Sequence, residues 1–188
     1  TYGFTSPLWL LLISAGGKVG ADLSIAAKGI DLVFASCSLL VFFLLAVELI
    51  RETNVALLAT LGFSMNVWFL RWAGSGMETS LSVCLVLGTV LYCLRNEYLL
   101  SMVLAGLLTL VRPEAAVIVP LLLADMFVNS VEKRQSVHTM LIALPGYAVV
   151  VVPWLLTALG TFGTIVPNTA RAKTGIHTGA GGALENIW

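Results

Sequence analysis

Long apolar runs separated by short polar breaks constrain the fold of this chain more than any other feature. The runs at residues 30–50, 55–72, 77–94 and 140–159 approach or reach the roughly 20 residues that a membrane-crossing helix needs. Charged residues make up only 11% of the 188 residues, whereas about a quarter is usual in a soluble domain. With a mean hydropathy of +0.97, the chain is predicted to be an integral membrane protein. Its net charge of zero argues against bulk nucleic-acid binding.

The polar breaks predict where the chain reverses direction. Pro113 removes a backbone donor and disfavours helical geometry at Arg112, so residues 98–127 are predicted to form two half-length segments rather than one helix. A reversal there places Arg51, Arg95 and the pair Lys133-Arg134 on one side, as the positive-inside rule expects. A continuous helix, the alternative, would separate Lys133-Arg134 from the other two. Glu48 and Arg51 are expected to form a helix-end ion pair.

The predicted fold class is all-α, a polytopic transmembrane helix bundle. We expect about six membrane segments, two of them short, together with an external helix at residues 8–15. This helix follows Thr5-Ser6-Pro7, a hydroxyl cap with proline in the first turn, and Trp9 suits an interfacial position. The predicted regions are an external loop with the interfacial helix (1–28), the bundle (29–160) and an external loop (161–188). The predicted location is the plasma (inner) membrane, with multiple passes.

Glu78 lies in a polar break that also holds Gly74 and Gly76. One interpretation is a solvated carboxylate that favours the N-terminal dipole of a helix. The other is a functional carboxylate that orients a sugar hydroxyl, an acceptor or a metal ion, because the glycines allow close backbone approach.

Two further breaks on the same predicted side carry cations. Arg112 and Glu114 form either a local ion pair or a site in which Glu114 orients Arg112 towards a phosphate, a role that suits the planar guanidinium. Asn168 and Lys173 belong either to an ordinary external loop with a turn or to a loop that binds anionic groups. All these polar groups are predicted to share the non-cytoplasmic face.

Several motifs together resemble bacterial membrane glycosyltransferases of the GT-C class. In chain order they are Tyr2-Gly3-Phe4-Thr5-Ser6-Pro7-Leu8-Trp9, Gly76-Met77-Glu78-Thr79, Arg112-Pro113-Glu114, Phe162-Gly163 and Pro167-Asn168-Thr169 followed by Lys173. The similarity is greatest to the actinobacterial arabinofuranosyltransferase-like branch, and more distant to the aminoarabinose and protein mannosyl transferases. Each motif is short, and the order and spacing carry the resemblance.

The resemblance implies transfer of a sugar from a polyprenyl-phosphate donor to a glycan, lipid or protein acceptor of the cell envelope, on the outer face of the membrane. It implies catalytic roles for Glu78 and Arg112, the latter at the donor phosphate. The substrate-binding candidates are Thr79, Glu114, Asn168 and Lys173. No cofactor is required by the sequence, and Glu78 is the candidate ligand if a divalent metal ion takes part.

The resemblance also implies a principal base in an acidic motif upstream of residue 1, so we expect the chain to be a fragment of a longer protein. Asp22 and Asp31 lie after the helix that starts at Pro7 and are not assigned that role. The alternative function is a membrane transporter or flippase-like protein without transferase activity, for which discontinuous helices near the membrane midplane are typical. A third interpretation is a non-catalytic membrane scaffold.

Overall fold

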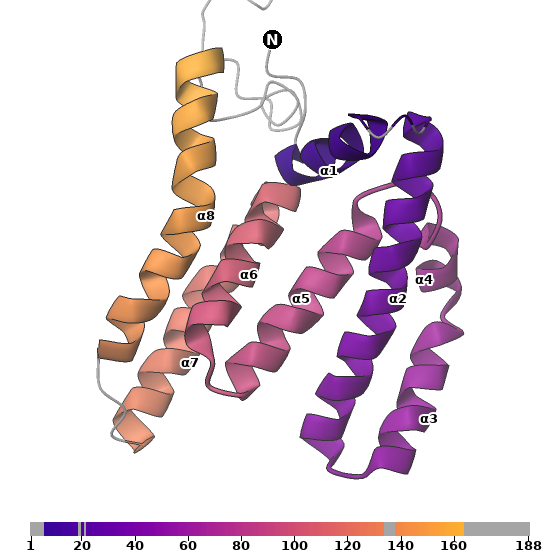
Figure 1. Cartoon of the computed structure of the whole chain (residues 1–188). Coiled ribbons are helices and arrows are strands. Elements are labelled where there is room, and N and C mark those ends of the chain that lie inside the picture. The colour runs from indigo at the N-terminus through magenta and orange to yellow at the C-terminus, as the bar shows by residue number, and fades with distance from the viewer. Residues whose placement is uncertain (1–5, 19, 21, 134–137, 164–188) are drawn as a thin grey trace, which may run out of the picture.

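The computed structural model describes residues 6–163, apart from residues 19, 21 and 134–137, and this part of the chain is helical with no strand. Most of the helices run side by side along one direction, and α1 lies across one end of them (Figure 1). The elements in chain order are α1 (Pro7–Lys18), α2 (Leu23–Ile50), α3 (Thr53–Ser64), α4 (Val67–Trp72), α5 (Thr79–Leu94), α6 (Tyr98–Val111), the 3-10 helix η1 (Pro113–Val117), α7 (Ile118–Lys133) and α8 (His138–Phe162).

Helix α1 begins at Pro7 as predicted, but it continues beyond residue 15 through two glycines to Lys18. A Cβ on Gly16 would lie 2.9 Å from the Cβ of Ala26, so α1 and the start of α2 approach too closely for a larger residue. Trp9 is buried in a cluster with residues of α2, α5 and α6. The indole of Trp9 therefore packs against protein, and the interfacial position of the helix stays a prediction.

Helix α2 starts earlier than the predicted residue 30, because Asp22 caps its N-terminus by accepting a hydrogen bond from the backbone N–H of Ser24 at 2.8 Å. It ends at Arg51, which adopts a left-handed conformation with φ of 59°. Such a C-cap geometry terminates helices. Glu48 pairs with Arg95 at 3.2 Å, not with Arg51 as predicted. The pair joins the C-terminal ends of α2 and α5.

Residues 55–72 do not form the single helix that the apolar run predicted. Helix α3 ends at Ser64, and Asn66 caps a separate helix α4 by accepting hydrogen bonds from the N–H groups of Trp68 (3.0 Å) and Phe69 (3.1 Å). An asparagine side chain competes for backbone donors in this way. Hydrophobicity alone does not reveal the interruption.

The predicted reversal at Arg112-Pro113-Glu114 is confirmed. Arg112 is extended, with φ of −138°, as expected for a residue before proline. The helices on either side form a hairpin. Buried residues of α6 (Tyr98, Met102 and Ala105) share one cluster with Leu122 and Met126 of the first half and middle of α7. Figure 1 shows α7 returning alongside α6.

Helix α8 packs in parallel against α6 through two glycines. A Cβ on Gly106 would lie 3.0 Å from the Cβ of Val150, and one on Gly146 would lie 3.0 Å from the carbonyl oxygen of Leu99. This contact lets the two helix backbones approach closely along much of α6.

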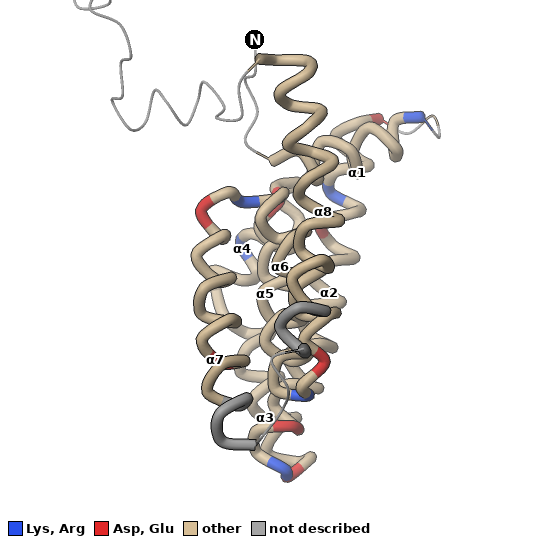
Figure 2. Tube along the Cα trace, turned by 90° about the vertical axis from the view of Figure 1, so that its left-hand side faces the viewer, with Lys and Arg blue, Asp and Glu red and all other residues tan. Residues whose placement is uncertain are grey.

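Two helical stretches, Leu23–Ile50 (28 residues) and Ala143–Phe162 (20 residues), are long and apolar enough to cross a membrane. Helices α3, α5 and α6 are apolar but have only 12, 16 and 14 residues, short of the roughly 20 needed for a complete span. Charged residues gather towards the two ends of the helices, with few between them (Figure 2).

Candidate functional site

Three charged side chains from two parts of the chain meet at the end of the bundle where α1 lies (Figure 1). Arg112 follows α6, Glu78 precedes α5, and Glu114 belongs to η1. One terminal nitrogen of Arg112 lies 3.7 Å from Oε1 of Glu78, and the other lies 4.0 Å from Oε1 of Glu114. The structure thus brings together Glu78 and Arg112, the two predicted catalytic residues. It also contains the local Arg112–Glu114 pair of the alternative interpretation.

Arg112 is held loosely by its two partners. Neither carboxylate reaches hydrogen-bond distance, and the buried Nε of Arg112 has no hydrogen-bond partner among the described residues. A buried donor without an acceptor costs about 1–3 kcal/mol. The guanidinium therefore retains donors that an anionic ligand could use.

The two carboxylates differ in their surroundings. The side chain of Glu78 is 22% exposed and that of Glu114 is 73% exposed. Glu78 occupies the N-cap position of α5, but its side chain makes no capping hydrogen bond. The carboxylate of Glu78 is thus the better placed of the two for contact with a bound molecule.

Asp31 is a buried part of this region that the sequence analysis missed. Its side chain is fully buried in α2, and its Oδ2 accepts hydrogen bonds from the N–H groups of Gly74 at 2.9 Å and Gly76 at 3.0 Å. The hydroxyl of Ser75 approaches the same oxygen at 3.5 Å. A lone carboxylate in an apolar run was the available signal, since an ionisable group there is costly.

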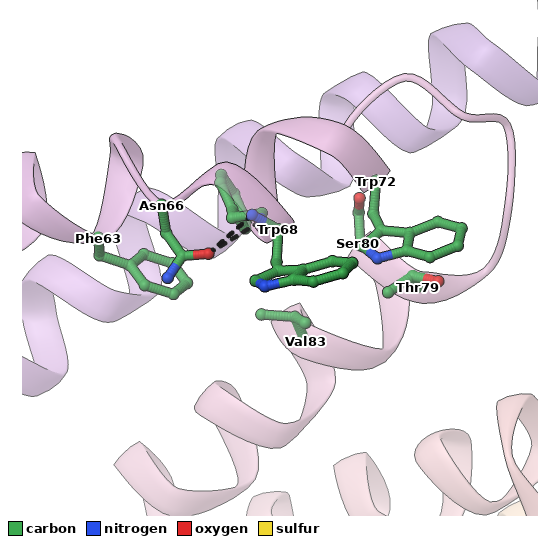
Figure 3. Close-up of a pocket in the computed structure, with 8 residues that line it drawn as sticks. Phe63, Asn66, Trp68, Trp72, Thr79, Ser80 and Val83 are labelled. Atoms are coloured by element: carbon green, nitrogen blue, oxygen red, sulfur yellow. Dashed lines mark hydrogen bonds between the residues drawn. The ribbon is translucent and has the colours of Figure 1, made fainter.

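A pocket of about 230 Å³ opens between the α3–α4 region and α5. Figure 3 shows Trp68 and Trp72 of α4 facing residues from the start of α5. The guanidinium of Arg71 lies 5.6 Å from the ring of Trp68 and 5.9 Å from that of Trp72. The lining residues are Phe63, Asn66, Trp68, Phe69, Trp72, Thr79, Ser80 and Val83.

Thr79, a predicted substrate-binding residue, therefore lies both next to Glu78 in sequence and in the wall of an aromatic pocket. The other predicted residues of the external loop, Asn168 and Lys173, lie outside the described residues. In the part of the chain that the structure describes, no three His, Cys, Asp or Glu side chains converge as metal ligands. Comparison with protein-family models, curated proteins and solved structures finds no match for this chain.

Proposed function

We propose that this chain is part of a membrane glycosyltransferase, which moves a sugar from a polyprenyl-phosphate donor to a cell-envelope acceptor. The observation that carries the proposal is Arg112, whose buried Nε has no hydrogen-bond partner among the described residues and whose terminal nitrogen lies 3.7 Å from Oε1 of Glu78. The motif resemblance adds the substrate class. An arginine with free donors beside a carboxylate suits a reaction in which phosphate leaves and a hydroxyl arrives.

In the proposed reaction, the acceptor hydroxyl attacks the anomeric carbon of the donor. The bond from that carbon to the phosphate oxygen breaks, and the polyprenyl phosphate leaves with the electron pair. Arg112 stabilises the charge that grows on the phosphate. The acceptor proton passes to a general base, a role that we assign neither to Glu78 nor to Glu114.

The formal charges of Arg112, Glu78 and Glu114 affect how a phosphate group would bind at the site. Arg112 and its two carboxylate partners sum to −1, counting one cation and two anions. The exposed Glu114 can turn towards solvent, whereas Glu78 is more enclosed. We therefore assign Glu114 to orienting Arg112 in the absence of donor, and Glu78 to positioning the sugar or acceptor, with a divalent ion as an additional candidate ligand of Glu78.

The aromatic pocket supports the lipid part of the proposed substrate. Its wall includes Thr79, the residue after Glu78, so an isoprenoid chain in the pocket would extend from a head group at the charged residues. Asn168 and Lys173 retain their predicted role in a loop over the site.

A multi-pass location in the plasma membrane is supported by two observations. Large apolar side chains are exposed on α2, α3, α4, α7 and α8, as expected for a lipid-facing surface. Two helical stretches, Leu23–Ile50 and Ala143–Phe162, are long and apolar enough to cross a membrane. Basic residues lie at both ends of the bundle, with Arg51 and Arg95 at one and Lys18, Lys28 and Arg71 at the other, so we assign the Arg112 end to the non-cytoplasmic side from the motif resemblance. The short helices would need protein or a thinned membrane around them.

The test is a transfer assay of the full-length protein with radiolabelled polyprenyl-phosphate sugars. Arg112→Ala is expected to lower transfer by roughly 10²–10³-fold, the scale for loss of one charge-stabilising donor, while membrane insertion is unchanged. Arg95→Ala is the matched control, because it removes an arginine ion-paired at the opposite end. Near-normal transfer by Arg112→Ala would contradict the assignment.

A transporter or flippase-like function remains the second candidate, and one observation favours it. The break between α3 and α4 makes this apolar run a discontinuous helix, and discontinuous helices are typical of transporters. Reconstituted vesicles separate the two functions. Movement of a labelled lipid-linked sugar across the bilayer without transfer to an acceptor would support the second candidate.

A further inference from the structure

Asp31 connects helix α2 to the segment that precedes Glu78 in the candidate site. We infer that Asp31 is a positioning residue that anchors the Gly74–Ser75–Gly76 segment and thereby sets the place of Glu78 relative to Arg112. The anchoring is a structural statement about the chain. Its consequence for sugar transfer rests on the proposed function.

The anchoring geometry is convergent. The backbone N–H groups of Gly74 and Gly76 donate to a single carboxylate oxygen at 2.9 and 3.0 Å. The hydroxyl of Ser75 lies 3.5 Å from the same oxygen, and its nearer acceptor is the carbonyl oxygen of Trp72 at 2.9 Å. Gly74 and Gly76 have φ of 114° and 75°, a region that residues with a side chain rarely adopt. The glycines are therefore needed for the segment to wrap around the carboxylate.

The segment also lies against α2. A Cβ on Gly76 would meet the Cβ of Ala27 and the Cγ of Lys28, each at 3.5 Å. Ala27 precedes Asp31 by four residues, so the two share one face of the helix. This face of α2 packs against Gly76 at Ala27 and accepts hydrogen bonds from Gly74 and Gly76 at Asp31.

The same face of α2 holds the start of α5. Ser38, seven residues after Asp31, is buried and donates a hydrogen bond to the carbonyl oxygen of Ser80 at 3.3 Å. The carbonyl oxygen of Glu78 in turn accepts from the N–H of Ser82 at 3.0 Å. Glu78 is thus fixed on both sides, with only Met77 between it and the anchored Gly76.

A carboxylate has a specific advantage at this position. Hydrogen bonds from backbone N–H groups to an ionised acceptor are stronger than those to a neutral one. The other oxygen, Oδ1, is buried without a partner among the described residues, which adds a desolvation cost. The hydrogen bonds from Gly74 and Gly76 offset this cost only while the segment keeps its position against α2.

Hydrogen–deuterium exchange of the full-length protein tests the anchoring. In Asp31→Asn, the amides of Gly74 and Gly76 are expected to exchange up to roughly 10-fold faster, because a neutral amide oxygen accepts a weaker hydrogen bond than a carboxylate. Asp22→Asn is the matched control, since Asp22 caps the same helix and, among the described residues, its side chain accepts from the N–H of Ser24 alone. Unchanged exchange in Asp31→Asn would overturn the inference.

Gly76→Ala tests the same anchor from the other side, in case Asp31→Asn fails to fold. The alanine is strained at φ of 75° and should accelerate exchange of the same segment. Both variants therefore predict one local effect, and protection that persists in Gly76→Ala would also contradict the anchoring.

Electron paramagnetic resonance distances test the positioning without any assay of activity. Nitroxides are attached at Met77→Cys and Val117→Cys, two exposed positions on either side of the Glu78–Arg112 pair, after the native cysteines are replaced. The distance distribution should widen with Asp31→Asn and stay narrow with Asp22→Asn. A narrow distribution in Asp31→Asn would overturn the positioning role even if exchange increased.

Transfer kinetics separate this inference from the proposed function. If the protein transfers sugar, Asp31→Asn is expected to lower kcat with little change in KM, because the donor contacts remain. If the wild-type protein transfers no sugar, the proposed function fails, while exchange and distance still decide on Asp31. An active protein with unchanged kcat in Asp31→Asn would contradict the positioning role.

Discussion

At the scale of single residues, the candidate site depends on how firmly each charge is held. Arg112 contacts two carboxylates without a hydrogen bond to either, whereas Asp31 accepts two close hydrogen bonds from the backbone. The first arrangement leaves donors for a ligand, and the second fixes a segment. Arg112 and Asp31 are both charged residue types near one end of the bundle, and their hydrogen-bond geometry is what separates a ligand-binding role from a structural one.

Glu78 and Glu114 offer a matched pair of substitutions on either side of Arg112. Glu78→Gln is expected to lower transfer by about 10-fold or more, because the enclosed carboxylate is assigned to the sugar or acceptor. Glu114→Gln should lower it by less than about threefold, because exposed ion pairs contribute little. The assay is initial rate with a lipid-linked sugar, and equal losses in the two variants would contradict the distinct roles.

The sequence predicted two of these residues and missed the third for physical reasons. Glu78 and Arg112 were placed together because both lie at breaks on one predicted side. Asp31 was set aside by its position relative to the helix at Pro7, although a carboxylate in an apolar run is itself a signal. Its partners are the backbone N–H groups of Gly74 and Gly76. Almost every residue type has such a group, so the sequence does not show which ones Asp31 contacts.

At the scale of elements, close packing of α6 on α8 depends on residues without side chains. Gly106 faces Val150 and the carbonyl oxygen of Tyr147, and Gly146 faces Leu99. Small residues at helix contacts are typical of membrane bundles. The contact fixes the α6 segment that leads to Arg112.

Gly106→Leu is expected to lower the free energy of unfolding by about 1–3 kcal/mol, the usual cost of overpacking. Gly62→Leu in α3 is the control, because a Cβ on Gly62 meets nothing within 4 Å and leucine favours a helix over glycine. Thermal unfolding in detergent measures both. A Gly106→Leu variant as stable as Gly62→Leu would show that the contact is looser than described.

Hydrophobic patterning predicted where helices lie better than where they break. The reversal at Pro113 was predictable because proline acts locally on the backbone. The break before α4 was not, because Asn66 acts by capping Trp68 and Phe69 through its side chain, and an isolated asparagine in an apolar run has several other roles. The extension of α1 through Gly16 likewise depends on contact with Ala26.

At the scale of the whole molecule, the two ends of the helix bundle carry different sets of charged residues. One end carries Glu78, Arg112 and α1, and the other carries the turns after α2 and α5, joined by the pair of Glu48 and Arg95. The predicted order of reversals is thus reproduced by the described helices. The membrane around them is part of the proposal.

Cysteine labelling tests this arrangement in cells that express the full-length protein without its native cysteines. Val117→Cys, in the exposed part of η1, is expected to react with a membrane-impermeant maleimide added outside. Glu97→Cys, in the turn before α6, should react only after permeabilisation. Labelling of both positions from the same side would contradict the proposed topology.

The helix hairpin has a consequence for the surrounding lipid. Helices α6 and α7 contain 14 and 16 residues, or roughly 21 and 24 Å at 1.5 Å per residue, whereas the hydrocarbon core of a bilayer is about 30 Å thick. Helix α2, with 28 residues, exceeds that thickness. In a bilayer, the side of the bundle with α6 and α7 would favour a thinner hydrocarbon core. The side with α2 would tilt or favour a thicker one. The bundle would therefore be held most easily where the bilayer is thinner beside α6 and α7 than beside α2.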